Sequence, residues 1–405
     1  MTSLKLETAG VYLPDLNARG GAERLGLVMA LELARIGIQT TIFTHSMSSV
    51  QEIEADLGDA MSDVIIVVLD QPHAKPGRLQ ALRDVTALRS CAREIRSHRP
   101  DLFVNCDYKS KLPGCGRRNV FYCHFPYDVG PRRGGSIATR TYNRAAEAVE
   151  RRLVHPAAES FLDTYEQIWA NSEFTRSHVR TMWRREAEIL YPPCEMLEQA
   201  EKHNQIVAVG RFQSGSGATI PHKSQQFLVD SFRELPELHR EGWKLALVGA
   251  AGSTDQRFVE DLRRRSADLP ITFHVNPTWR ELTRIVARST IFWHAQGVGG
   301  DAARFPNTQE HFGISTVEAM SAGAVPLVFG RAGPAEVVEP IEGIEPWQTS
   351  ASLLEATRSL AEMNSAERSE LAQRCVDRAH QFDRGHFRRR LADLADLRTA
   401  DLAGL

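Results

Sequence analysis

Residues 310–329 read EHFGISTVEAMSAGAVPLVF, which combines a helical pattern with an apolar run. Gly313 and Ile314 are expected to begin a helix and Gly323 to end it, because glycine readily adopts the left-handed conformation found just after helices. The apolar run at 325–329 then predicts a buried strand. A helix that leads directly into a buried strand is typical of an α/β sheet. The N-terminus of such a helix offers free amides to an anionic or polar ligand.

Apolar runs alternate with helical patterns along most of the chain, which is typical of βαβ units around parallel sheets. The predicted strands lie at 6–13, 40–44, 64–69, 102–105, 120–123, 167–171, 205–209, 243–248, 271–274, 291–294 and 325–329. The predicted helices lie at 20–36, 81–97, 222–235, 256–266, 279–288 and 314–321, and residues 351–405 read as helical. The predicted fold class is therefore α/β, with two Rossmann-like domains facing across a cleft at the carboxyl ends of their strands.

The sequence Tyr191-Pro192-Pro193 interrupts this pattern, because proline removes backbone donors and biases the preceding residue away from helix. We place the domain boundary just after it. The predicted domains are 1–196 and 197–382, and a C-terminal helix at 383–405 is expected to pack back on the N-terminal domain. A chain of 405 residues suits two domains of about 150 to 200 residues each.

Composition excludes several classes of protein. A formal net charge of -2 argues against a dedicated nucleic-acid binder, which needs basic excess to neutralise phosphates. The cysteines lack zinc-ligand spacing, so reduced thiols are expected. Neither a signal peptide nor an apolar run long enough to span a membrane is found, and a cytoplasmic location is expected. The basic run at 176–185 leaves open a peripheral contact with the inner membrane face, although a solvated helix face is the simpler interpretation.

Two glutamates flank the start of the helix at 314–321. Glu310 lies on the loop ahead of it, where a carboxylate can accept hydrogen bonds from sugar hydroxyls. Glu318 lies within the helix, where a carboxylate can accept two hydrogen bonds from a ribose diol. Taken alone, two glutamates at this spacing are more typical of a solvated helix.

Other candidate residues stand at strand ends in the N-terminal half. Gly20 and Gly21 open the first predicted helix and would let backbone amides approach a phosphate, although glycines at a helix start need no ligand. His124 ends the strand VFYCH, where a buried structural histidine is the alternative. Asp107 and Lys109 follow the strand at 102–105 and are candidates for contact with an acceptor.

The C-terminal half has a similar set of candidates. Arg211 closes the strand of VAVGRF, and Lys223 follows a glycine- and serine-rich loop. A surface pair on a loop is the alternative interpretation for these two cations. His294 and Gly297 lie at the end of another strand, and the loop that follows them is expected to shape a nucleotide or sugar pocket.

These motifs together resemble family 4 of the retaining glycosyltransferases, which have the GT-B fold. The segment from Glu310 to Glu318 matches the E-x7-E motif of that family, and the AMSAG that follows continues the match. The segments NSEFTRSHVRTMW, LYPPC and VAVGRF resemble the interdomain segment of the family and the first strand of its donor domain. WHAQGVGGD followed by EHFGIS is most similar to the branch of mannosyltransferases in lipid-linked oligosaccharide assembly. The resemblance covers about residues 10–385.

The resemblance implies a role for each candidate in the C-terminal, donor-binding domain. Glu318 would bind the ribose, and Glu310 would contact the transferred sugar. Arg211 and Lys223 would hold the donor pyrophosphate in place of a divalent ion. The remaining donor-binding residues of this domain would be Gly313, Ile314, Ser315, His294 and Gly297.

In the N-terminal, acceptor-side domain, the resemblance implies that His124 contacts the donor sugar and that Gly20 and Gly21 approach the donor phosphate. Asp107 and Lys109 would meet the acceptor. No cofactor and no essential metal are expected. The expected partners are a nucleotide-sugar donor and a carbohydrate, lipid-linked or small-molecule acceptor.

The implied reaction is transfer of a hexose, with mannose favoured, by front-face substitution with retention of configuration. A donor phosphate oxygen would take the proton of the acceptor hydroxyl. Three alternatives stay open from the residues: a phosphorylase or sucrose-synthase-like enzyme of the same fold, a nucleotide-sugar epimerase, and a non-catalytic nucleotide-sugar-binding subunit. A dinucleotide-dependent oxidoreductase is disfavoured, because the GxGxxG turn is absent.

Overall fold

The structure is a computed structural model. It describes residues 6–17, 20–47, 49–57, 60–70, 80–129, 137–213 and 223–396. The chain divides into two compact units. The N-terminal unit comprises Met1–Asn171, Thr175–Leu190 and Arg388–Leu405, and the C-terminal unit comprises Ser172–Phe174 and Tyr191–Phe387. The units therefore change just before the two prolines, whereas the sequence placed the boundary after residue 196.

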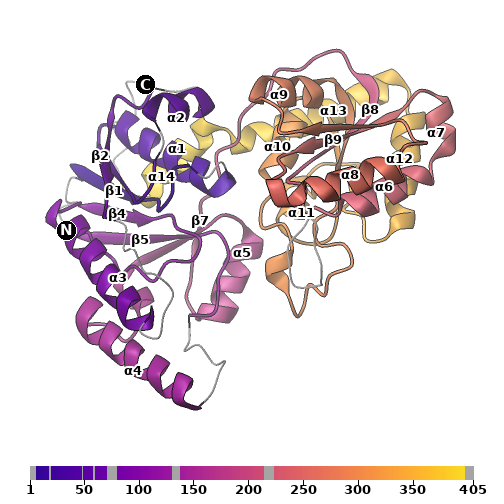
Figure 1. The fold of residues 1–405 in the computed structure, drawn as a ribbon. Helices are drawn as coiled ribbons and strands as arrows, with labels where there is room; N and C mark the ends of the chain where they lie inside the picture. Colours follow the sequence, from indigo (N-terminus) through magenta and orange to yellow (C-terminus); the bar gives the residue numbers. More distant parts are fainter. Residues whose placement is uncertain are drawn as a thin grey trace. The chain divides into compact units, whose positions relative to one another are not determined.

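The N-terminal unit is built around a parallel sheet. Its strands are β1 (Thr8–Tyr12), β2 (Gln39–Thr44), β3 (Val64–Val68), β4 (Leu102–Asn105), β5 (Arg118–Cys123), β6 (Gln167–Ala170) and β7 (Glu188–Ile189). Its helices are α1 (Gly21–Arg35), α2 (Val50–Leu57), α3 (Gln80–Ser97), α4 (Ile137–Val154) and α5 (Glu173–His178), with a 3₁₀ turn at Phe161–Thr164 and a π-helical turn at Val179–Trp183. Within the described residues the sheet has seven strands in the order β3-β2-β1-β4-β5-β6-β7. In Figure 1, α1 lies over one face of this sheet, and α3 and α4 lie over the other.

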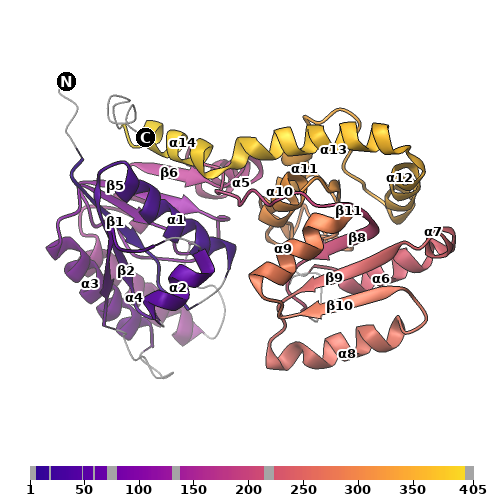
Figure 2. The ribbon, with the colours of Figure 1, turned by 90° about the horizontal axis from the view of Figure 1, so that it is seen from above.

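The C-terminal unit is built in the same way. Its strands are β8 (His203–Val209), β9 (Lys244–Gly249), β10 (Ile271–Val275), β11 (Ser289–His294) and β12 (Val325–Val328). Its helices are α6 (Gln225–Arg233), α7 (Pro236–Arg240), α8 (Gln256–Arg265), α9 (Trp279–Arg288), α10 (Ile314–Ser321), α11 (Gly333–Val338), α12 (Ser350–Glu362) and α13 (Ser365–Ala379), with 3₁₀ turns at Ser253–Asp255, Pro306–Thr308 and His380–Phe382. The described strands form a five-stranded parallel sheet in the order β10-β9-β8-β11-β12. Figure 2 shows α13 running beside α10 and α11.

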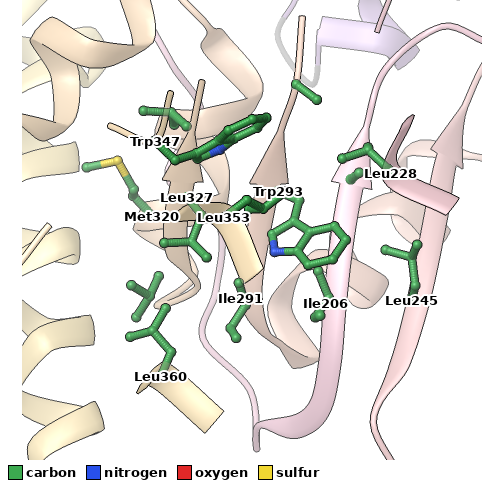
Figure 3. Close-up of a cluster of buried hydrophobic side chains, with 14 of the residues drawn as sticks. Ile206, Leu228, Leu245, Ile291, Trp293, Met320, Leu327, Trp347, Leu353 and Leu360 are labelled. Atoms are coloured by element: carbon green, nitrogen blue, oxygen red, sulfur yellow. The ribbon is translucent and has the colours of Figure 1, made fainter. Parts of the chain in front are cut away.

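Burial explains why the central strands are almost wholly apolar. Strand β4 (LFVN) is buried at every residue, and so is β11 (STIFWH), because parallel sheets are covered on both faces. In the core of the C-terminal unit, Trp293 of β11 lies among apolar side chains, beside Ile206 of β8 (Figure 3). Its indole Nε1 donates a hydrogen bond to Thr357 Oγ1 of α12, at 3.2 Å. This hydrogen bond holds Trp293 in place next to His294, the last residue of β11.

Helix α14 (Arg384–Leu394) leads the chain from the C-terminal unit back into the N-terminal unit. Arg388 forms a close ion pair with Glu32, a fully buried carboxylate of α1. Arg35 Nη1 lies 2.6 Å from the other oxygen of Glu32. Arg390 Nη2 lies 2.9 Å from Glu188 Oε2 of β7. Charged contacts therefore hold this part of α14 against its own unit.

The predicted helix at 222–235 is wrong at its start. The helix there is α6, which begins at Gln225, because Ser224 has a φ of 54° and so adopts the left-handed conformation. The loop predicted at 212–222 lies outside the described residues from 214 onward. Helices α2 and α4 and strand β7 were not predicted. No helix in the described part of the chain is long and apolar enough to cross a membrane.

Candidate functional site

The carboxyl edge of the C-terminal sheet brings several predicted site residues together. Strand β8 ends at Val209, and Gly210 and Arg211 follow it. A Cβ atom on Gly210 would lie 2.4 Å from Lys223 Cγ. Glycine therefore lets the stem of Lys223 lie against the strand end. Ligands of parallel sheets bind at this edge, so Lys223 is placed where a ligand is expected.

The centre of the site is an ion pair. Lys223 Nζ makes a close hydrogen-bonded contact with Glu310 Oε2, and His294 Nε2 lies 4.0 Å from the same oxygen. Burial opposes the charge of Glu310, but the Lys223 ammonium outweighs this effect, aided by His294 when its ring is protonated, and the pKa of Glu310 is lowered to about 2. The Glu310 carboxylate is therefore ionised at neutral pH and can only accept hydrogen bonds.

His294 is a neutral side chain in this cluster. Burial lowers the pKa of His294 to about 4, although the Glu310 carboxylate acts in the opposite direction. Within the described residues, neither ring nitrogen has a hydrogen-bond partner. Buried polar atoms in folded proteins almost always have partners. His294 also lines a small pocket together with Gly210 and Lys223.

The N-terminus of α10 lies on the loop that carries Glu310. Its N-cap residue, Gly313, has a φ of 95°, and no side chain caps the helix. A Cβ atom on Gly313 would lie 2.9 Å from Pro334 Cγ, so a larger residue would strain this turn. Thr316 Oγ1 is buried near Gly313 and has no hydrogen-bond partner in the described part of the chain. The amides that begin with Ile314 and Ser315 thus form an end suited to an anion.

The remaining candidates of this unit lie around the cluster. Arg211 is exposed and makes no ion pair with any described residue. Glu318 lies on the second turn of α10 and is buried. Gly297 has a φ of 97°, and a Cβ atom there would lie 2.3 Å from Gln309 Oε1, so only glycine fits this turn. The structure therefore joins Lys223, Glu310 and His294 directly.

The N-terminal unit holds a second group of candidates at the carboxyl edge of its own sheet. His124 follows β5, and its Nε2 lies 3.0 Å from the carbonyl oxygen of Cys106. Because a carbonyl only accepts, this nitrogen carries the proton. Burial lowers the pKa of His124 to about 4, so the ring is neutral and its Nδ1 is an acceptor.

The other predicted residues of this unit are also at strand or helix ends. Asp107 is half-buried, and this burial raises the pKa of its carboxyl against the opposing hydrogen bonds from the amides of Lys109 and Tyr108. Lys109 is exposed. Gly20 is the N-cap of α1 and Gly21 its first residue, and no side chain caps this helix start. A Cβ atom on Gly20 would lie 2.5 Å from Glu23 Oε2.

Sequence reasoning missed several polar residues beside these candidates. Thr316 lies in the first turn of α10. Its place just after the helix start at Gly313 is the one sequence signal for a contact with a ligand. His45 and Tyr108 follow β2 and β4, where a systematic look at strand ends would have found them. Among the described residues, no group of three or more His, Cys, Asp or Glu side chains could hold a metal ion.

Each of the two units matches a family of glycosyltransferases. Residues 19–194 match the family described as Glycosyltransferase Family 4, and residues 196–382 match Glycosyl transferases group 1. The chain belongs to glycosyltransferase family 4. The α/β fold class and the glycosyltransferase class predicted from the sequence are thereby confirmed.

Sequence relatives of this family 4 chain include two curated mannosyltransferases. The GDP-Man:Man(3)GlcNAc(2)-PP-Dol alpha-1,2-mannosyltransferase of Xenopus laevis is 29% identical over 195 residues, which cover 43% of this chain and 36% of that protein. The protein of the same description from Homo sapiens is 28% identical over 192 residues, covering 44% and 36%. The chain thus matches about a third of the length of these relatives.

A solved structure extends the likeness to the whole fold. HepE of Anabaena, in complex with UDP and glucose, superposes with a TM-score of 0.66 at 15% identity, covering 96% of this chain and 99% of that chain. At this identity the likeness bears on the fold, and it places the family 4 chain among GT-B proteins.

The neutral state of His124 predicts an acid-sensitive stability. Its pKa is lowered from 6.5 to about 4 in the folded chain, so between these values the unfolded chain binds a proton that the folded chain does not. Stability is therefore lost as the pH falls through this window, by up to about 3 kcal/mol. Urea unfolding at neutral pH and at about pH 4.5 should show His124→Gln losing less stability than the wild type.

The matched control for this measurement is His203→Gln, which changes an exposed histidine at the start of β8. It should keep the acid sensitivity of the wild type. Equal acid sensitivity in His124→Gln and the wild type would contradict a buried neutral His124.

Proposed function

We propose that this chain transfers a mannosyl group from GDP-mannose to an acceptor hydroxyl, with retention of configuration and without an essential metal. The observation that carries the proposal is the cluster of Lys223, Glu310 and His294 beside the uncapped N-terminus of α10. It combines a cation and free amides for a diphosphate with an ionised carboxylate and a neutral imidazole for a sugar.

The diphosphate of the donor is expected to lie between Lys223 and the first amides of α10. Its negative charge would compete with Glu310 for the Lys223 ammonium, whose side chain is 28% exposed and can reach a ligand. The exposed guanidinium of Arg211 adds a second cation at the same strand end. Such fixed cations and amides stabilise the charge that develops on a departing diphosphate, which is the task a divalent ion performs in other transferases.

The transferred sugar is expected to meet an ionised carboxylate, Glu310, and a neutral imidazole, His294. Glu310 accepts from sugar hydroxyls, and a neutral His294 can both donate and accept. This set fits the hydroxyls of a neutral hexose. Mannose and GDP are proposed because the sequence relatives named above use GDP-Man.

In the proposed mechanism the diphosphate leaves and the acceptor hydroxyl attacks from the same face of the sugar. The bond from the anomeric carbon to the donor oxygen breaks, and a bond to the acceptor oxygen forms on that face. The acceptor proton passes to a phosphate oxygen of the departing diphosphate. The side chains of this chain thus position the reactants and stabilise charge, and Glu318 holds the ribose.

The acceptor is proposed to be lipid-linked, again from the names of the relatives. A peripheral contact with the cytoplasmic membrane face would fit such an acceptor, and residues 176–185 were the predicted contact. Within that segment Met182 is exposed, but Arg180 is paired with Glu186 and Arg185 with Asp163. These ion pairs reduce the attraction of the segment for anionic lipid.

Donor binding tests the proposal directly. Calorimetry in EDTA should show GDP-mannose binding in preference to UDP-glucose and UDP-N-acetylglucosamine. Glu318→Gln should weaken GDP-mannose binding about tenfold or more, since it replaces a charged acceptor of the ribose hydroxyls by a neutral amide.

Slow hydrolysis of the bound donor should release α-mannose first, as proton NMR can show.

The control for donor binding is Glu345→Gln, an exposed glutamate of the same unit, which should bind the donor like the wild type. Binding that requires a divalent ion would contradict the metal-free proposal. Release of β-mannose would contradict retention. Binding without any turnover would support a nucleotide-sugar-binding subunit instead.

The ion pair makes a second prediction, which separates stability from donor binding. Lys223→Met leaves the half-buried Glu310 charge without its partner and should lower stability by about 1 to 3 kcal/mol. The double variant Lys223→Met/Glu310→Gln removes both charges and should recover most of that loss in urea unfolding. Neither variant should bind GDP-mannose with the wild-type affinity. Full donor affinity in the stable double variant would show that the pair is structural only.

A further inference from the structure

Strand β10 is an edge of the C-terminal sheet, beside β9 (Figure 2). The residues on either side of it bond to β9: the Pro270 carbonyl accepts from an amide at 3.1 Å, and the Asn276 amide donates to a carbonyl at 2.9 Å. In a parallel ladder, successive residues bond alternately to one side and to the other. The backbone groups of Ile271, Phe273 and Val275 therefore point away from β9, along the open edge.

This edge lacks the features that usually protect an edge strand. The sequence ITFHV has no proline and no Asp, Glu, Lys or Arg, and its register with β9 is regular. The opposite edge, β12, contains Pro326, and Phe329 just after it forms a parallel bridge with Trp347. Among the described residues, no hydrogen bond from outside the sheet reaches the amide of Phe273 or Val275. Strand β10 thus offers an open row of backbone donors and acceptors.

The sequence of β10 is complementary to itself when two copies run antiparallel. If Phe273 lies opposite Phe273 of a second copy, Ile271 lies opposite Val275, and Thr272 lies opposite His274. Apolar residues then face apolar residues, and polar residues face polar ones. The two Phe273 residues would exchange both of their backbone hydrogen bonds. Each Val275 amide would donate to an Ile271 carbonyl, and the Ile271 amide already bonds within its own chain.

Helix α8 covers the face of the sheet that carries the Phe273 ring. The guanidinium of Arg263 lies 5.7 Å from the centroid of that ring, and the ring centroid lies 6.5 Å from that of Phe212. Figure 2 shows α8 beside β10. Two sheets joined at β10 across a two-fold axis would therefore place α8 of one copy next to α8 of the other, in antiparallel orientation.

The charges of α8 suit this arrangement. Asp255 and Arg257 offset each other near the start of the helix. Glu260 and Asp261 follow them, and residues 263–265 are all arginine. In an antiparallel pair of these helices, the acidic turn of each copy approaches the basic end of the other. This charge complementarity favours a second copy of the chain over a partner of uniform charge.

We propose that β10 is a dimer interface at which two copies of this chain join their C-terminal sheets, with a two-fold axis at Phe273. The inference goes beyond the proposed transferase function and does not depend on it. Backbone hydrogen bonds supply the attraction, the pairing of side chains sets the register, and the charges of α8 set the orientation.

The corresponding edge of the N-terminal sheet is less suited to a second copy. Strand β3 is more apolar, and Ile65 and Val68 are 47% and 54% exposed. However, Asp63 and Asp70 flank this strand, and both are exposed. Antiparallel pairing of β3 with itself would bring Asp63 of one copy close to Asp70 of the other, and like charges in such pairs are destabilising. The contact between two copies is therefore expected at β10 and not at β3.

Sedimentation velocity tests the interface on the full-length chain. The wild type should form dimers in the micromolar range, and higher salt should weaken them, because it screens the charges of α8. Val275→Pro removes an amide that faces the second copy, while the bonds to β9 stay. Its dimer dissociation constant should rise about tenfold or more. Its circular dichroism should stay that of the wild type.

The matched control is Val68→Pro in β3. The Val68 amide also faces away from its sheet, because the next residue, Leu69, donates to Thr44 of β2 at 2.7 Å. This variant should dimerise like the wild type. A monomeric wild type, or wild-type dimer affinity in Val275→Pro, would overturn the interface. Loss of dimers in Val68→Pro alone would place the contact at β3 and would overturn it as well.

A disulfide tests the register and leaves the apolar residues of β10 intact. Positions 272 and 274 of opposite copies would form non-hydrogen-bonded pairs, whose Cα atoms are about 4.5 Å apart, a spacing that allows a disulfide. The double variant Thr272→Cys/His274→Cys should therefore give covalent dimers with oxidised glutathione, whereas the native cysteines are buried. Ala351→Cys, at an exposed position of the same unit, should give none. Dimers of the double variant that stay non-covalent under oxidation would contradict this pairing of β10.

Discussion

The carboxylate of Glu310 can stay charged while largely buried at the end of a sheet only because Lys223 lies against it. The rest of the C-terminal unit makes this contact possible. Gly210 leaves room for the lysine stem at the end of β8. Gly313 caps the start of α10, on the loop that carries Glu310. A carboxylate, a cation and free amides thus share one strand edge. They form a charge-balanced group that an anionic ligand can rearrange.

Both units place a neutral histidine at the carboxyl end of a buried strand. His124 follows β5 and His294 ends β11, and burial lowers the pKa of each to about 4. Neutral rings suit the recognition of hydroxyls, because they donate and accept without attracting an anion. The charged side chains at these edges include Glu310, Lys223 and Arg211 in one unit and Asp107 and Lys109 in the other.

Much of the fold could be predicted because local signals agreed with the tertiary structure. Helix α9 was predicted with its observed bounds, and its start carries a capping box of Thr278 and Glu281. Helix α10 was equally clear between two glycines. Helix α4 was not predicted, and few of its described side chains are buried. The site residues Glu310 and Lys223 were named from the motif, but their direct pairing joins positions 87 apart and has no local signal. His45 and Tyr108 belong to no motif, so only the strand order brings them beside Asp107.

A crystal structure of the chain with GDP-mannose, grown in EDTA, would show whether the cluster of Lys223, Glu310 and His294 is the donor site. We expect the diphosphate at the start of α10, with Lys223 Nζ moved from Glu310 onto a phosphate oxygen, and the mannosyl hydroxyls in contact with Glu310 and His294. A donor bound elsewhere, with the Lys223–Glu310 pair intact, would rule out this cluster as the donor site.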